Sequence, residues 1–186
     1  MIKSKISKNI GIILKVRHIF HISTLRTLYF SFIHPYITYC IKVWGRCATV
    51  HLESIYRLQK VCCRLISNSP VRTESTPLFK KLNVLNVYQL YTLSVSLIMY
   101  RFCFGVLPKY IVNCFSYRYE LTNVVTRQRN HLAIPLCKTK ISQNCLKFMG
   151  AKLWNRIITM MELNVSQNMF KRRIKNLLFE KKLNFL

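Results

Sequence analysis

The chain has 186 residues, of which 30 are Lys or Arg and five are acidic, so its formal net charge is +25. All five acids are glutamates, and chemistry that needs paired aspartates, such as two-metal phosphoryl transfer, is therefore nearly excluded. Because 51% of the residues are hydrophobic, the chain can bury a core, and we expect its basic residues to lie on a folded surface that binds a polyanion.

The N-terminal part shows the helical spacing of apolar side chains. Residues 2–20 form an amphipathic pattern with a basic outer face, which predicts a first helix. A second helix is expected over residues 25–43, with Ser23 or Thr24 as its cap. Pro35 lies inside this second pattern and should kink the helix or split it.

A third helix is predicted from about residue 52 to residue 67, and it carries a basic stripe. Arg57, Lys60 and Arg64 are spaced by three and four residues, so they share one helix face. Such a stripe can follow a phosphate backbone, although a solvated face is the commoner meaning of this pattern.

The next elements are marked by proline, asparagine and glycine. Short helices are predicted over residues 77–82 and 108–115, and a long apolar helix over residues 87–104 with Asn86 as its cap. Gly45 and Gly105 are predicted helix stops, the first of them in the left-handed conformation.

The stretch between Lys81 and Arg101 contains 19 consecutive uncharged residues, about the length that spans a bilayer. Asparagine, glutamine, serine and threonine interrupt it, and unpaired amides in hydrocarbon are costly. We favour a buried helix in a helical domain and keep a membrane span near residues 82–100 as the alternative.

The composition changes at residue 116. Residues 117–147 are rich in Thr, Asn, Gln and Arg, which favours extended segments or a β-hairpin there. Ser166 then suits the cap of a basic terminal helix that reaches about residue 183. The expected fold is mainly α: a helical bundle over residues 1–115 is followed by a basic C-terminal region over residues 116–186.

The residues that usually carry catalysis or hold metals are not arranged for either purpose. The eight cysteines include no C-x-x-C pair, and buried reduced thiols in a reducing compartment are the favoured interpretation. The glycines form no phosphate-binding loop, and the five histidines carry no local signature of a Cys/His nucleophile. We therefore expect no catalytic residue, no metal site and no cofactor.

Several sequence strings carry a family resemblance. Residues 28–40 (LYFSFIHPYITYC), followed by Val43-Trp44-Gly45, closely resemble the segment after the catalytic palm in reverse transcriptases of non-LTR retrotransposons, the jockey and LINE-like elements. Further landmarks follow in the family's order, namely residues 58–60, 64–66, 76–79, 107–108, 126–128 and 150–155. The resemblance covers nearly the whole chain.

The resemblance implies a helical thumb and the C-terminal portion beyond it, which hold the template–primer duplex while the palm performs synthesis. The metal-binding aspartates of an RNA-directed DNA polymerase are not among these residues, so the chain alone is not expected to be an enzyme. The expected function is non-sequence-specific binding of RNA or an RNA/DNA hybrid, with a separate or missing palm domain as a further partner. No small-molecule substrate is expected, and the expected location is the nucleus or cytoplasm, in a ribonucleoprotein.

The candidate nucleic-acid contacts combine the basic stripe with the polar segment. Aromatic faces stack on bases while Lys and Arg neutralise phosphates, and Tyr117 and Tyr119 lie close in sequence to arginines. The residues selected are Arg57, Lys60, Arg64, Arg127, Arg129 and Lys152.

Three other functions remain open. The chain could be a small basic membrane protein, held by anionic lipid through its cations, or a truncated relic without function. A basic structural protein of a ribosome or mitochondrion would share the charge but would not explain the ordered landmarks.

Overall fold

The computed structural model describes residues 2–121 and 127–183, and its contacts group the chain into two compact units, Met1–Tyr91 and Thr92–Leu186. The prediction of a mainly α fold is confirmed. The predicted domain boundary near residue 115 stays a prediction.

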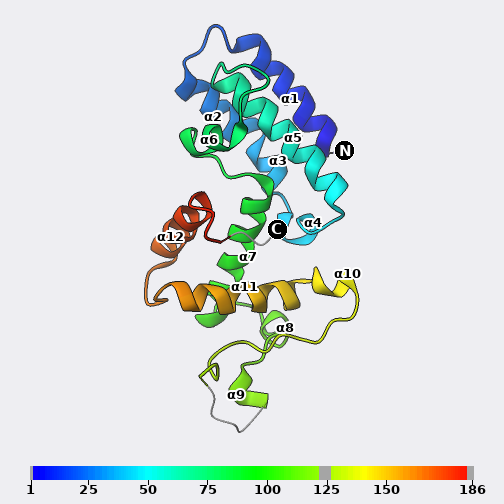
Figure 1. Cartoon of the computed structure of the whole chain (residues 1–186), viewed down its shortest axis with the longest axis vertical. Helices are drawn as coiled ribbons and strands as arrows, with labels where there is room; N and C mark the ends of the chain where they lie inside the picture. Colours follow the sequence, from blue (N-terminus) through cyan, green and yellow to red (C-terminus); the bar gives the residue numbers. More distant parts are fainter. Residues whose placement is uncertain (1, 122–126, 184–186) are drawn as a thin grey trace. The chain divides into compact units, whose positions relative to one another are not determined.

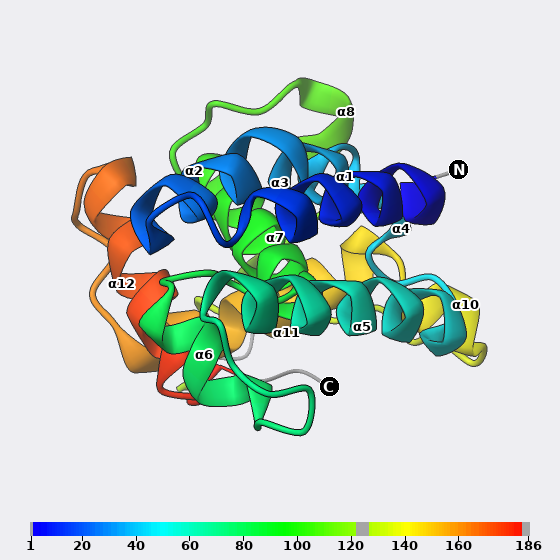
Figure 2. The ribbon, with the colours of Figure 1, turned by 90° about the horizontal axis from the view of Figure 1, so that it is seen from above.

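The first unit is built from helices that pack around α5 (Figure 1). Its helices are α1 (Ile2–Val16), α2 (Ile22–Phe32), α3 (His34–Thr38), α4 (Ile41–Trp44), α5 (Thr49–Ile66), α6 (Ser75–Lys81) and the start of α7 (Val87–Cys103). α1 runs alongside α5 in both views, and α2 contacts both of them (Figure 2). As the spacing predicts, Ile6, Ile10 and Ile13 of α1 are buried in this core.

Pro35 splits the predicted second helix. α2 ends at Phe32, and α3 begins at His34 with the proline in its first turn, where a missing N–H costs nothing. Asn9 of α1 compensates the break, because its Nδ2 donates to the carbonyl of Phe32 at 2.6 Å.

Two local predictions in this unit are wrong. The cap of α2 is not Ser23 or Thr24 but His21, whose ring Nδ1 accepts from the backbone N–H of Ser23. Gly45 is not left-handed, since its φ is −65°. A Cβ at Gly45 would collide with the ring of Tyr91, so close packing explains this glycine.

A buried polar cluster ties three segments of the first unit together. Gln59 of α5 donates from Nε2 to the hydroxyl of Tyr29 at 2.9 Å and to the carbonyl of Leu85 at 3.3 Å. Its Oε1 accepts from the backbone N–H of Val87 at 2.8 Å. Gln59, Tyr29 and Val87 have no exposed surface, and burial raises the pKa of Tyr29. Because all three bonds are shielded from water, the amide fixes the entry into α7.

α7 begins and ends as the sequence predicts. Asn86 and Gln89 cap it reciprocally, each accepting the other's backbone N–H on a side-chain oxygen, at 2.9 and 3.0 Å. Gly105 follows the end of α7 and has a φ of +68°, the left-handed conformation in which glycine stops a helix. Within the described residues, no helix combines the length and apolar character needed to cross a membrane.

The second unit contains the rest of α7 with α8 (Lys109–Val112), α9 (Arg118–Leu121), α10 (Lys140–Gln143), α11 (Leu146–Met160) and α12 (Gln167–Phe179). Helix α11 was not predicted. It packs its Gly150 so closely on α7 that an added Cβ would lie 2.8 Å from the sulfur of Met99 and 3.2 Å from the Phe115 ring. Phe170 of α12 completes this core, 4.7 Å from Tyr100 and 6.1 Å from Trp154 between ring centroids.

The C-terminal helix forms as predicted. Ser166 is its N-cap and accepts from the N–H of Met169, and the buried face carries Phe170, Ile174 and Leu178. α12 ends at Phe179 rather than near residue 183.

In place of the predicted hairpin, the described residues form a single antiparallel bridge between Tyr117 and Leu132. Residues 122–126 of that segment lie outside the described part.

Candidate nucleic-acid interface

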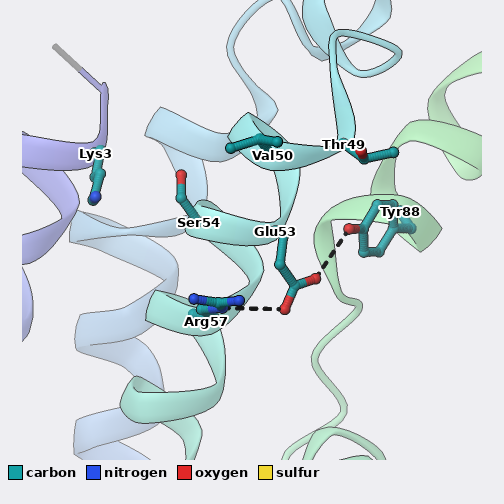
Figure 3. A pocket seen from close by; sticks show the side chains of 7 residues that line it. All are labelled: Lys3, Thr49, Val50, Glu53, Ser54, Arg57 and Tyr88. Carbon is teal, nitrogen blue, oxygen red and sulfur yellow. Dashed lines mark hydrogen bonds and ion pairs between the residues drawn. The ribbon is translucent and has the colours of Figure 1, made fainter.

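Arg57 and Lys60 of the predicted stripe lie around one carboxylate on α5. Arg57 Nε is 3.4 Å and Lys60 Nζ 3.6 Å from Glu53 Oε1. The hydroxyl of Tyr88 donates to the other oxygen of Glu53 at 3.4 Å (Figure 3). The Lys60 ammonium also lies 3.9 Å from the centroid of the Tyr56 ring, and its side chain is 25% exposed against 75% for Arg57. Arg57 is therefore the more accessible of the two cations.

Arg64, one turn further along α5, is engaged with the chain itself. Its Nε donates to the carbonyl of Thr73 at 2.9 Å, across the loop between α5 and α6. One of the five guanidinium N–H donors is therefore committed to the backbone of the chain. The stripe thus lies along α5 as predicted, but each of its three members also contacts a group of the chain itself.

A hollow of about 540 Å³ opens beside the first turns of α5 (Figure 3). Its lining residues are Lys3, Thr49, Val50, Glu53, Ser54, Arg57 and Tyr88. Lys3 and Arg57 bring positive charge to its wall, while Glu53 places a carboxylate in the same wall. The mixed charge gives this hollow no clear preference for an anion.

The polar segment of the second unit forms a loop whose two ends are held together. The N–H of Ala133 donates to the carbonyl of Ser116 at 2.9 Å, and the N–H of Arg118 to that of His131 at 3.0 Å. Asn155 of α11 reinforces this closure, because its side-chain amide bonds both backbone groups of Leu132, at 2.8 and 2.9 Å. We call residues 116–121 and 127–133 the closed loop.

Arg127 and Arg129 lie on the closed loop and are exposed. Tyr117 and Tyr119 stack on the same loop, with ring centroids 5.2 Å apart and planes inclined by 11°. The Arg129 guanidinium lies 6.0 Å from the centroid of the Tyr119 ring. Arg129 thus lies near the exposed Tyr119 ring, and whether these residues contact a nucleic acid stays a prediction.

Lys152 lies on the outer face of α11. It is exposed, and its ammonium is 6.0 Å from the centroid of the Phe148 ring. The six selected residues thus form two sets, with Arg57, Lys60 and Arg64 in the first unit and Arg127, Arg129 and Lys152 in the second.

Charge dominates the surface on which these residues lie. Every Lys, Arg and Glu falls in the described part, and five glutamates offer too few carboxylates to pair with 30 cations. On α12, for example, the three consecutive cations Lys171, Arg172 and Arg173 are exposed. A surface of this kind attracts phosphates over long distances.

The described residues form no cluster of three or more His, Cys, Asp or Glu side chains that could hold a metal ion. All eight cysteines are free thiols, but the interpretation of buried thiols holds for Cys62 and Cys63 and is wrong for the exposed Cys40, Cys114 and Cys145. Burial raises the pKa of Cys63 to about 12 and that of Cys62 well above its usual value. Such thiols stay protonated at neutral pH, and a protonated thiol is a poor nucleophile.

Two contributors to this interface were not selected from the sequence. Arg118 donates from Nη1 to the side-chain oxygen of Gln128, which joins the two arms of the closed loop. Asn155 anchors that loop to α11, and its place in the Trp154-Asn155 landmark is the signal that could have found it. Comparison of the chain with protein-family models, with curated proteins and with solved structures finds no match.

Proposed function

We propose that this chain binds RNA or an RNA/DNA hybrid through its basic surface, without sequence specificity and without synthetic activity of its own. The observation that carries the proposal is a folded, mainly helical body on which 30 Lys and Arg face only five carboxylates. Phosphate contacts supply affinity of this sequence-independent kind, because each neutralised phosphate releases condensed counterions.

The resemblance to the post-palm region of non-LTR reverse transcriptases gives this binding a role. A thumb-like body would grip the duplex while a separate palm domain, which would supply the aspartates and metal ions, performs synthesis. An intracellular ribonucleoprotein, nuclear or cytoplasmic, is the corresponding location.

The test is the salt dependence of binding to a fluorescent RNA/DNA hybrid, followed by anisotropy with the purified chain. If roughly six to ten phosphates are neutralised, affinity should fall by about 10³- to 10⁵-fold between about 50 and 200 mM salt. A nearly flat salt dependence would contradict the proposal, and so would a chain that binds no nucleic acid, as a relic would.

The selected contacts are tested by paired neutralisation. Arg127→Gln with Arg129→Gln should reduce the logarithmic salt slope by about 2, since each phosphate contact contributes about 1. The matched control, Lys138→Gln with Lys140→Gln, removes the same charge from exposed positions of the same unit and should change the slope less. Equal effects of the two pairs would contradict the assignment of the residues. Nucleotide incorporation by the purified chain would contradict the absence of synthetic activity.

A further inference from the structure

The closed loop presents an aromatic surface that phosphate binding does not explain. The Tyr119 side chain is 43% exposed although it is a large ring, and its stacking on Tyr117 is nearly parallel. Parallel stacked rings display a flat π-face of the kind that bases stack upon.

Tyr117 is held firmly beneath this surface. Its hydroxyl lies 3.5 Å from the sulfur of Cys103 on α7, and its backbone N–H donates to a carboxylate oxygen of Glu120 at 3.0 Å. Its ring lies 5.9 Å from that of Phe102, and burial together with the contact to Cys103 raises the pKa of its hydroxyl. A ring fixed in this way loses little entropy when a ligand stacks above it.

Cations lie at the edge of the same surface. The Arg129 guanidinium lies at the outer limit of the cation–π range from Tyr119, so a positive charge is close to the ring on which a base would stack. Arg127 is exposed two residues away. Together they supply the charge that the phosphates flanking a stacked base require.

We propose that Tyr119, backed by Tyr117, stacks an unpaired nucleobase while Arg127 and Arg129 bind the flanking phosphates of a single-stranded RNA or DNA segment. This inference rests on the proposed function and adds a preference for unpaired nucleotides at the closed loop. Inside a duplex both faces of each base are covered by its neighbours, so a protein ring finds no face to stack on. A duplex would therefore use the cations of this loop but not its rings.

The experiment uses the whole chain and compares two fluorescent ligands: a short oligouridine, and an RNA/DNA duplex whose strands are joined at both ends by linkers that carry no base. Tyr119→Ala should weaken oligouridine binding by about 5- to 150-fold and leave duplex binding within about twofold. Tyr119→Phe keeps the π-face and should bind like the parent. The control Tyr110→Ala removes another exposed tyrosine of the same unit and should change neither affinity.

The outcomes separate this inference from the proposed function. If the parent chain binds neither ligand, the proposed function fails. If it binds both but Tyr119→Ala changes the two affinities equally or not at all, only the stacking inference fails. Photocrosslinking of bromouridine to the unsubstituted chain gives a second readout that does not depend on a variant folding. The crosslinked peptide should contain Tyr119, and crosslinks confined to other peptides would overturn the inference.

Discussion

Replacing Gln59 with leucine tests the buried polar cluster of the first unit. The substitution keeps a side chain of similar length but removes both the donor and the acceptor of the amide. It leaves the Tyr29 hydroxyl, the Leu85 carbonyl and the Val87 N–H without their partner at positions that are at most 5% exposed.

The magnitude follows from these three losses. A buried polar group left without a partner costs about 1–3 kcal/mol, and the greater hydrophobicity of leucine offsets part of the sum. We expect Gln59→Leu to lower the free energy of unfolding by about 3 kcal/mol, a large share of the roughly 5–15 kcal/mol typical of a domain. With a urea dependence of about 2 kcal/mol per molar, the midpoint should fall by about 1.5 M.

Urea unfolding followed by circular dichroism measures this change. Gln167→Leu makes the same chemical change at an exposed position in the first turn of α12 and should alter stability by less than about 0.5 kcal/mol. Adding Tyr29→Phe to Gln59→Leu should cost less than the sum of the two single effects, by about 1 kcal/mol. A Gln59→Leu midpoint equal to or above that of the parent would refute the reasoning.

Further substitutions and one chemical probe test other contacts. Gly11→Ala should stabilise the protein by about 0.5–1 kcal/mol because nothing lies within 4 Å of the new methyl group in α1, as thermal unfolding would show. Gly150→Ala should instead destabilise it by about 1 kcal/mol, since overpacking exceeds the gain in helix propensity, and a higher melting temperature would contradict this. Asn155→Leu should cost about 2 kcal/mol and speed backbone hydrogen exchange in the closed loop, whereas unchanged exchange there would show that the loop is held by other contacts. At pH 8 a thiol reagent should modify the exposed Cys145 rapidly, whereas Cys63, whose pKa is raised by burial to about 12, should react only after unfolding. The stability that comes from the protonated Cys63 is fully present below the ordinary thiol pKa near 9 and is lost as the pH rises toward 12.

Elements with local signals could be predicted from the sequence. Asn86 and Gln89 lie within one turn of each other and Gly105 follows the last turn, so both ends of α7 are encoded nearby. The same holds for Ser166 at the start of α12.

Helix α11 shows why other elements could not be predicted. Met149, Leu153, Trp154 and Ile157 have helical spacing, yet Gly150 lies among them and argues against a helix in isolation. The glycine is accommodated because Met99 and Phe115 approach it, and those residues are distant in sequence. Tertiary packing thus decides an element that local propensity leaves ambiguous.

The candidate interface likewise has some features that local sequence spacing indicates and others that depend on contacts between distant residues. Helical spacing correctly placed Arg57, Lys60 and Arg64 along α5, and the Glu53–Arg57 pair has the i, i+4 spacing of a local helix rule. No local rule indicated that Lys60 shares this carboxylate or that the Thr73 carbonyl accepts from Arg64. The stacked Tyr117 and Tyr119 likewise lie beside the bridge to Leu132, which backbone hydrogen bonds close and the distant Asn155 reinforces.

The run of exposed cations on α12 also affects the protein when no ligand is bound. Lys171, Arg172 and Arg173 repel one another and the remaining excess of charge, and in dilute buffer this repulsion reaches over a Debye length of about 30 Å. Added electrolyte shortens that range to about 8 Å at 0.15 M and so relieves self-repulsion in the compact state. The free protein should consequently be easiest to purify and refold in concentrated salt, the conditions in which the proposed binding of a polyanion would be weakest.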